Sequence, residues 1–147
     1  MRAEELMIGD WVECVDSSHE KKVYAQIDAI EEGKTCILVR QDNCNWFLNI
    51  SFIKPISLTP KILVKNGWVR TKYAYGRDCM EIHGADELPE GVDNALSMAR
   101  WSIDKNYQYH FLDLCMWKGS VMQHNVHYVH QLQHAFRIFG IEKEIIL

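Results

Sequence analysis

Three histidines near the end of the chain have a spacing that places imidazoles on one face of a helix. His127, His130 and His134 fall at i, i+3 and i+7, and His124 lies just before them. Two histidines on one helical face can ligate zinc or another transition metal. The segment lacks the H-E-x-x-H pattern, and it contains no carboxylate that would complete a metal site. We therefore expect these histidines to lie in solvent or at the edge of the core, without a metal.

The thiols are a second candidate for chemistry. No C-x-x-C spacing occurs among the five cysteines, Cys14, Cys36, Cys44, Cys79 and Cys115, which favours free thiols in a reducing compartment. Cys79 or Cys115 beside a histidine would make a nucleophile, but no surrounding motif supports one. The apolar neighbours of Cys115 favour a buried structural thiol. A disulfide or zinc site joining Cys36 and Cys44 across a hairpin is the minor alternative.

Carboxylates gather in one segment that is rich in glycine and proline. Asp86, Glu87, Glu90 and Asp93 offer oxygen ligands for a divalent cation, but they lack the ligand order of an EF-hand loop. We expect a solvated loop here. No P-loop or Rossmann glycine pattern occurs. The sequence therefore predicts no catalytic, cofactor-binding or metal-binding residue, and we expect a protein that is not an enzyme.

Exposed aromatic residues are a further source of binding chemistry, since they can stack single-stranded bases or hold a proline-rich peptide. Four aromatic residues of the first third are candidates, although at least half of them must fill a core. Near the C-terminus, long glutamine amides can satisfy backbone groups at the rim of a sheet or face a partner. The candidate interaction surface comprises Trp11, Tyr24, Trp46, Phe47, His130, Gln131, Gln133 and His134.

Charge argues against nucleic acid as the first choice of partner. The 147 residues carry a formal net charge of −4, and the 16 basic residues are scattered, with Lys21-Lys22 as the longest basic run. A duplex binder usually has a clustered basic surplus that displaces counterions from phosphate. The first ten residues lack the apolar core of a signal peptide, and no run approaches the roughly 18 apolar residues of a membrane span. We expect a cytoplasmic protein without membrane contact.

Short strands separated by turns dominate the first third of the chain. The predicted strands are Trp11–Val15, Val23–Ile27, Thr35–Arg40, Trp46–Leu48 and Ile53–Leu58, with a 3₁₀ turn over Asn49–Phe52. Five strands this short bury one face only if the sheet closes on itself. Their order over Leu6–Ser57 resembles that of SH3-like and KOW-like barrels, and Ile8–Val12 looks like their first strand. That fold hosts many functions, so the resemblance predicts architecture and no ligand.

The rest of the chain mixes helix and strand. Thr59 as N-cap, Pro60 at N1 and Gly67 at C′ predict a short helix. Antiparallel strands are expected at Trp68–Tyr75, Met80–His83, Ala99–Ile103 and Tyr107–Met116, and a last strand within Trp117–Asn125. A closing helix is predicted by the apolar stripe Val129, Leu132, Phe136 and Phe139, with Gly140 at its end. We expect Leu132 and Phe136 to be buried and His134 and Arg137 to be more exposed.

The predicted fold class is α+β. An SH3-like β-barrel over residues 1–58 is expected to pack with a linking helix, a small antiparallel sheet and a C-terminal helix over residues 59–147.

Three short motifs carry a resemblance across the chain. They are V-H-Y-V-H-Q-L-Q-H at Val126–His134, P-I-x-L-T at Pro55–Thr59 and the strand at Ile8–Val12. Together they resemble a small family of bacterial proteins from prophages and mobile elements of gut anaerobes, for which no activity is known. The chain departs from that pattern in His134-Ala135-Phe136 and in a tail without the usual acidic end. The resemblance implies a genomic context and an architecture.

We expect a non-enzymatic binding or accessory protein that acts through protein–protein contacts, with its partner and oligomeric state open. The first alternative is a nucleic-acid-binding protein that uses the barrel, which a contiguous basic patch would favour. The second is an enzyme of unknown class, which a deep pocket with converging polar groups would favour.

Overall fold

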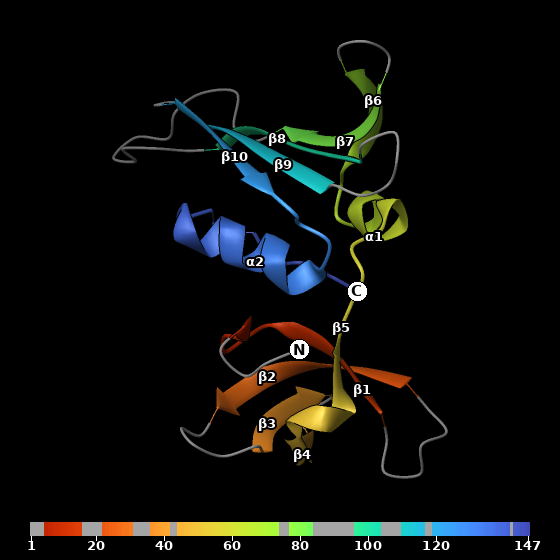
Figure 1. The fold of residues 1–147 in the computed structure, drawn as a ribbon, viewed down its shortest axis with the longest axis vertical. Helices are drawn as coiled ribbons and strands as arrows, with labels where there is room; N and C mark the ends of the chain where they lie inside the picture. Colours follow the sequence, from red (N-terminus) through yellow and green to blue (C-terminus); the bar gives the residue numbers. More distant parts are fainter. Residues whose placement is uncertain are drawn as a thin grey trace. The chain divides into compact units, whose positions relative to one another are not determined.

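The computed structural model describes most of the chain, in nine stretches: residues 5–15, 22–30, 36–41, 44–73, 77–83, 96–103, 110–116, 119–141 and 143–147. These residues form two compact units. Unit 1 joins residues 1–57 to residues 128–134, and unit 2 joins residues 58–127 to residues 135–147. Each unit contains its own five-stranded sheet, so the fold is predominantly β with two α-helices (Figure 1).

Unit 1 is an antiparallel sheet built from every strand expected in the first third. Its strands are β1 (Trp11–Val15), β2 (Lys22–Ile30), β3 (Cys36–Gln41), β4 (Cys44–Asn49) and β5 (Ile53–Pro55). Their order is β4-β3-β2-β1-β5, which leaves β4 and β5 at the edges of an open sheet. The 3₁₀ helix η2 (Ile50–Phe52) joins these two strands, and the Asn49 side chain accepts a hydrogen bond from the Ser51 amide at 3.0 Å.

Alternating side chains give this sheet one apolar face. Val12 and Cys14 on β1 are buried, as are Ala25 and Ile27 on β2. They meet further apolar side chains in one cluster, which comprises Leu6, Val12, Cys14, Ala25, Ile27, Val39 and Ile53. A register shift between Ile27 and Ala29 marks a bulge in β2. The period of two that predicted these strands thus also separates the core face from the outer face.

Unit 2 begins with the helix that its capping residues predict. α1 (Pro60–Lys65) has Thr59 as its N-cap, whose hydroxyl accepts a hydrogen bond from the Ile62 amide at 3.3 Å. Gly67 follows with φ +83°, a left-handed conformation that costs glycine little. The five strands of this unit pair in sequence as a meander: β6 (Val69–Tyr73), β7 (Arg77–His83), β8 (Leu96–Ile103), β9 (His110–Met116) and β10 (Gly119–His124).

The closing helix α2 (Val129–Ile138) matches its predicted apolar stripe. Leu132 and Phe136 are buried, Arg137 is exposed, and His134 is half-buried. Gly140 follows with φ +66°, as expected for a residue that ends a helix. Within α2, the residues from Val129 to His134 belong to unit 1, and those from Ala135 onward belong to unit 2. No helix in the described stretches has the length and apolar character needed to cross a bilayer.

The structure bears on the hypothesis that Cys36 and Cys44 meet across a hairpin, but not on the one about the acidic segment. The hairpin register sets Cys36 opposite Asn49 and Cys44 opposite Gln41, so the two cysteines lie at opposite ends of the ladder and not across from each other. Among the described residues, Cys14, Cys79 and Cys115 are free thiols. The acidic segment containing Asp86, Glu87, Glu90 and Asp93 lies outside the described residues.

Candidate functional site

The four aromatic candidates of unit 1 divide between the two faces of the sheet. Trp46 lies opposite Val39 in the ladder and so shares the core face, although 39% of it remains exposed at edge strand β4. Tyr24 and Phe47 lie on the other face and are 46% and 67% exposed. Trp11 shares that face, since it lies opposite Gln26, and it is half-buried. The core-filling explanation therefore fails for Tyr24 and Phe47.

Polar residues occupy the space between these aromatic side chains. One row of the ladder runs from Trp11 through Gln26 and Arg40 to Asn45 across β1, β2, β3 and β4. On β2, Tyr24 precedes the row member Gln26 by two residues. On β4, Phe47 follows the row member Asn45 by two residues. We call this surface the aromatic face; it comprises Trp11, Tyr24, Gln26, Arg40, Asn45 and Phe47.

Two described cations on and beside the aromatic face have acidic partners. Arg40 pairs with Asp28 at 3.4 Å between Nη1 and Oδ1. Lys22 pairs with Glu13 at 3.1 Å between Nζ and Oε1. These exposed pairs contribute little stability, but they lower the local positive charge. Arg40 and Lys22 therefore add no unbalanced positive charge to the aromatic face.

The two glutamines of the C-terminal motif differ in role. Gln133 is 7% exposed, its Oε1 accepts a hydrogen bond from the Trp11 amide at 3.0 Å, and its Nε2 donates to the Gly9 carbonyl at 3.1 Å. This is the amide role at a sheet rim that the sequence suggested. Gln131 is half-buried, and its Oε1 accepts from the Tyr128 amide at 3.1 Å at the start of α2.

His134 is held by a buried carboxylate. Its Nε2 donates a hydrogen bond to Oδ2 of Asp10 at 2.7 Å, and Asp10 is fully buried. The same Oδ2 accepts from the Met7 amide at 2.8 Å. His134 is half-buried and more exposed than Leu132 and Phe136, which fits the expected position at the edge of the core. The sequence did not predict its carboxylate partner, which lies 124 residues away in the chain and not inside the helix.

His130 is buried deeper than expected. It is 4% exposed, stacks on Tyr128 with ring centroids 5.7 Å apart and planes within 8°, and meets His134 edge-on. Burial lowers the pKa of His130; the charge of Asp10 opposes this shift, His134 adds to it and Glu5 opposes it. The Nδ1 atom of His130 has no hydrogen-bond partner within the part of the chain that the structure describes.

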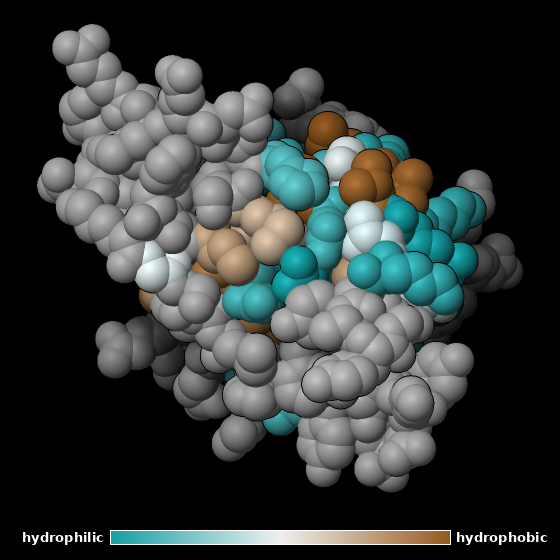
Figure 2. Space-filling model, turned by 90° about the horizontal axis from the view of Figure 1, so that it is seen from above, coloured by the Kyte–Doolittle hydropathy of each residue, from teal (hydrophilic) through white to brown (hydrophobic). Residues whose placement is uncertain are grey.

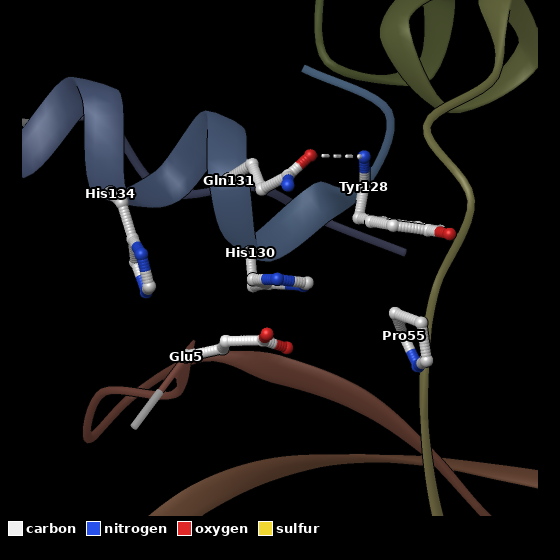
Figure 3. Close-up of a pocket in the computed structure, with 6 residues that line it drawn as sticks. All are labelled: Glu5, Pro55, Tyr128, His130, Gln131 and His134. Carbon is white, nitrogen blue, oxygen red and sulfur yellow. Dashed lines mark hydrogen bonds between the residues drawn. The ribbon is translucent and has the colours of Figure 1, made fainter. Parts of the chain in front are cut away.

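These residues surround a cavity in unit 1, here called the histidine pocket, with a volume of about 480 Å³ (Figure 3). Its lining comprises Glu5, Pro55, Tyr128, His130, Gln131 and His134. In the close-up, the Glu5 carboxylate faces the ring of His130 from the opposite wall. The residues that the structure describes contain no group of three potential ligands able to hold a metal ion. The sequence analysis named three of the six lining residues as candidates, His130 and His134 from their spacing and Gln131 from its amide, and the fold supplies the others.

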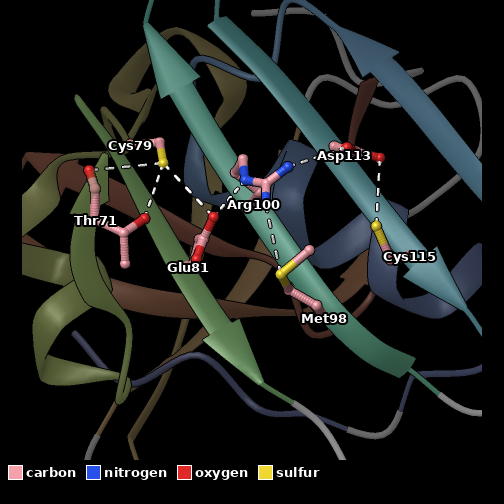
Figure 4. A network of polar contacts seen from close by, with 7 residues as sticks. All are labelled: Thr71, Cys79, Glu81, Met98, Arg100, Asp113 and Cys115. Carbon is pink, nitrogen blue, oxygen red and sulfur yellow. Dashed lines mark hydrogen bonds and ion pairs between the residues drawn. The ribbon is translucent and has the colours of Figure 1, made fainter. Parts of the chain in front are cut away.

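Unit 2 has a polar network on one face of its sheet (Figure 4). The register aligns Glu81, Arg100 and Asp113 across β7, β8 and β9. Arg100 donates through Nε to Oε1 of Glu81, and its Nη1 lies 3.7 Å from Oδ2 of Asp113. Burial alone would raise the pKa of Glu81, but the hydrogen bond and charge of Arg100 outweigh it and lower that pKa. The adjacent row of Met80, Trp101 and Leu112 fills the core.

Two thiols lie beside this network, and the surroundings of Cys115 do not activate it as a nucleophile. The Sγ atom of Cys79 lies 3.1 Å from the Thr71 hydroxyl and 3.8 Å from Oε1 of Glu81. Burial raises the pKa of Cys115, as does the charge of Asp113. A raised pKa lowers the thiolate fraction on which nucleophilic attack depends. We interpret the network as an ion-paired support of the sheet.

The view from above in Figure 2 shows a mixed surface. Teal and brown residues alternate over the coloured area, and no single brown area covers it. Large continuous apolar patches commonly mark interfaces. The coloured residues of this view therefore offer no such patch, and the candidate sites remain the aromatic face and the histidine pocket.

Comparison of the chain with models of protein families, with curated proteins and with solved structures found no match, so these sites are interpreted from their own geometry.

Proposed function

We propose that the protein is a non-enzymatic binding module that recognises an extended segment of a protein partner through the aromatic face. The observation that carries this proposal is the exposure of Tyr24 and Phe47, 46% and 67%, on the same side of one sheet. Covering an exposed aromatic side chain with a partner lowers the free energy of the complex, and aromatic residues are enriched in binding interfaces. Between them, Gln26 and Asn45 offer amides that can hydrogen-bond the backbone of a peptide.

The resemblance of the strand order to that of SH3-like barrels supports the same function. The strand order β4-β3-β2-β1-β5, with a 3₁₀ helix between β4 and β5, resembles that of SH3-like barrels. We propose that unit 1 is a barrel of this type, whose exposed aromatic residues hold peptides. The resemblance of the C-terminal motif further suggests an accessory protein of a mobile element, acting in the cytoplasm.

The alternative of nucleic-acid binding has weaker support. Stacking on Tyr24 and Phe47 would suit single-stranded bases, but phosphates need nearby cations. Arg40 and Lys22 are paired with carboxylates, and the whole chain has a net charge of −4. A protein segment therefore fits the aromatic face better than a polyanion.

The histidine pocket is the feature that favours the enzyme alternative. A histidine oriented by a buried carboxylate, as His134 is by Asp10, is an arrangement used for general-base catalysis. Among the described residues, the lining includes no serine, threonine, cysteine or lysine that such a base would activate. For this reason we assign the pocket to binding and not to catalysis.

Selection from a displayed library of random peptides tests the proposed function. The full chain is immobilised, and enriched peptides are then titrated against Phe47→Ala, Tyr24→Ala and the control Phe52→Ala, whose native side chain is 40% exposed on η2. We expect each change on the aromatic face to weaken binding by about tenfold or more, because aromatic anchors dominate such interfaces. The control should bind like the native chain.

Two results would contradict the proposal. One is the absence of any peptide enriched over the bare support, and the other is equal binding by Phe47→Ala and the native chain. A parallel titration with fluorescent oligothymidylate separates the nucleic-acid alternative. Binding of the oligonucleotide that depends on Phe47 and weakens with added salt, in place of peptide binding, would support that alternative.

A further inference from the structure

The sheet of unit 1 ends in an edge strand that lacks the usual protection against pairing. β4 is the last strand at one end of the order β4-β3-β2-β1-β5, and its register with β3 is regular along its whole length. Edge strands offer backbone N–H and C=O groups to other strands, and proteins protect them with charges, proline or bulges. β4 contains no charged residue, no proline and no glycine. It presents instead Trp46 and Phe47, which are 39% and 67% exposed.

The opposite edge of the same sheet differs from β4. β5 contains Pro55 and the exposed Lys54, two residues that discourage the addition of a strand. Just after β5, the Ile56 carbonyl accepts a hydrogen bond from the Val129 amide at 2.9 Å, so the chain covers this part of the edge with its own backbone. Within the part of the chain that the structure describes, β4 pairs with β3 alone. The edge of β4 is therefore the more suitable one for pairing with another molecule.

The side chains along β4 follow the same order in both directions. The stretch Asn45-Trp46-Phe47-Leu48-Asn49 has an amide at each end and a large apolar side chain on each side of the central phenylalanine. Trp46 and Leu48 belong to the core face, and the other three residues belong to the outer face. In an antiparallel pair with Phe47 on a two-fold axis, residues equally far before and after Phe47 lie opposite each other. Such a pair therefore keeps each face of the sheet continuous.

Pairing of two copies about Phe47 also places similar side chains opposite each other. Trp46 of one copy lies opposite Leu48 of the other, which extends the apolar core past the edge where Trp46 is 39% exposed. The two Phe47 rings lie opposite each other on the outer face, and Asn45 lies opposite Asn49. Aromatic and apolar cross-strand pairs stabilise a sheet, whereas like charges directly opposite each other destabilise it. Since this stretch contains no charge, no such repulsion opposes self-pairing.

We propose that two copies of this chain pair antiparallel along β4, with Phe47 at the two-fold axis, and thereby join their first sheets into one. This inference goes beyond the proposed function, because it uses the edge of the sheet and not its outer face. Residues 45–49 of each copy form a small contact compared with the roughly 20–30 residues a side of a standard interface. We therefore expect association that depends on protein concentration.

The oligomeric state of the full chain, measured by analytical ultracentrifugation over a concentration series, tests this pairing. Phe47→Lys and Phe47→Glu each place two like charges opposite each other at the axis, so each should weaken association by about tenfold or more. An equimolar mixture of the two variants should recover dimers with one copy of each, since opposite charges then meet. Ile8→Lys, at a 65% exposed position of unit 1 before β1, is the matched control and should associate like the native chain.

Three results would overturn the proposal: a native chain that stays monomeric up to its solubility limit, undiminished association of either charged variant, or a mixture that recovers no dimers. Recovery in the mixture also shows that both variants fold. A monomeric chain whose alternate β4 amides are protected from hydrogen exchange by selected peptides would assign the edge to a strand of another protein, and would equally overturn the proposal. Because the sedimentation measurement contains no peptide, its failure is distinguishable from failure of peptide binding by the aromatic face.

Discussion

At the scale of single residues, the pair formed by His134 and Asp10 is the main departure from sequence reasoning. The helical spacing of the histidines suggested a face in solvent or at the edge of the core, and no carboxylate lies nearby in the sequence. The carboxylate comes instead from Asp10, just before β1, and lies 2.7 Å from Nε2 of His134. A contact between residues so far apart leaves no signal in local periodicity, so only the fold reveals it.

The first prediction concerns this pair. His134→Ala should lower the free energy of unfolding by about 1–3 kcal/mol, because it removes a hydrogen bond from a fully buried carboxylate. Arg137→Ala, on the exposed side of the same helix, should change it by less than about 0.5 kcal/mol. Denaturant melts of both variants provide the comparison.

A double-mutant cycle that combines His134→Ala with Asp10→Ala measures the interaction energy between these two residues. The coupling between the two substitutions should be about 0.5–3 kcal/mol, as for residues in direct contact. Additive effects, or a harmless His134→Ala, would restore the solvated interpretation of His134.

The second prediction concerns the effect of His130 on the pH dependence of folding stability. Burial lowers the pKa of His130 in the folded state below the ordinary value of 6.5. The unfolded chain therefore binds a proton at His130 more readily than the folded chain does. Its contribution to stability is therefore complete above about pH 6.5 and is lost as pH falls through the lower folded-state pKa. Each pKa unit of difference corresponds to about 1.4 kcal/mol.

His130→Phe serves as the comparison, since it keeps an aromatic ring and removes the titration. Unfolding free energies measured from about pH 7 to pH 5 should fall more steeply for the native chain than for this variant. Parallel pH profiles would show that protonation of His130 does not oppose folding.

At the scale of elements, the sequence predicted almost every helix and strand correctly, because their signals are local. The Thr59 cap, Pro60 and Gly67 mark α1, and alternation marks the strands of unit 1. The Leu132 and Phe136 stripe marks the buried side of α2. The sequence also predicted that the first sheet closes into a barrel, but β4 and β5 lie at opposite ends of its strand order and do not pair. Such closure depends on long-range pairing, which no local pattern encodes.

The third prediction concerns the attachment of the start of α2 to the sheet of unit 1. Gln133 satisfies both the Trp11 amide and the Gly9 carbonyl, and it is 7% exposed. Gln133→Leu keeps a similar size but leaves these backbone groups without partners, at a cost of about 1–3 kcal/mol for each buried group left unsatisfied. Ile138→Ala, at a 66% exposed position of the same helix, is the control and should cost far less. Equal unfolding midpoints for the two variants would show that Gln133 does not hold this contact.

At the scale of the whole molecule, neither compact unit is a continuous stretch of chain. Unit 1 includes residues 128–134, and unit 2 includes residues 135–147. Val129 donates its amide hydrogen to the Ile56 carbonyl at 2.9 Å, and Tyr128 bridges to Ser57. The last twenty residues thus contribute to the core of each unit, a property that composition and local pattern alone do not reveal.

The fourth prediction is that neither unit folds well without this segment. Removal of residues 128–147 takes away Phe136, which is 1% exposed, and the contacts of Gln133 and His134. We expect a chain that is insoluble or unfolds without a sharp transition, because loss of a buried aromatic residue alone costs about 3–5 kcal/mol of a total near 5–15 kcal/mol. Calorimetry of the truncated chain is the measurement, and a sharp cooperative transition would contradict the expectation.

The central claim, that the aromatic face binds a protein segment, is tested most directly by photocrosslinking in the cells that produce the protein. A benzophenone amino acid replaces the residue at position 47 in one version of the full chain and at position 138, also exposed, in another. The account predicts a covalent adduct with a defined protein from position 47, lost when Tyr24→Ala is added, and no such adduct from position 138. Crosslinking to nucleic acid, identical adducts from both positions, or none from position 47 would contradict it.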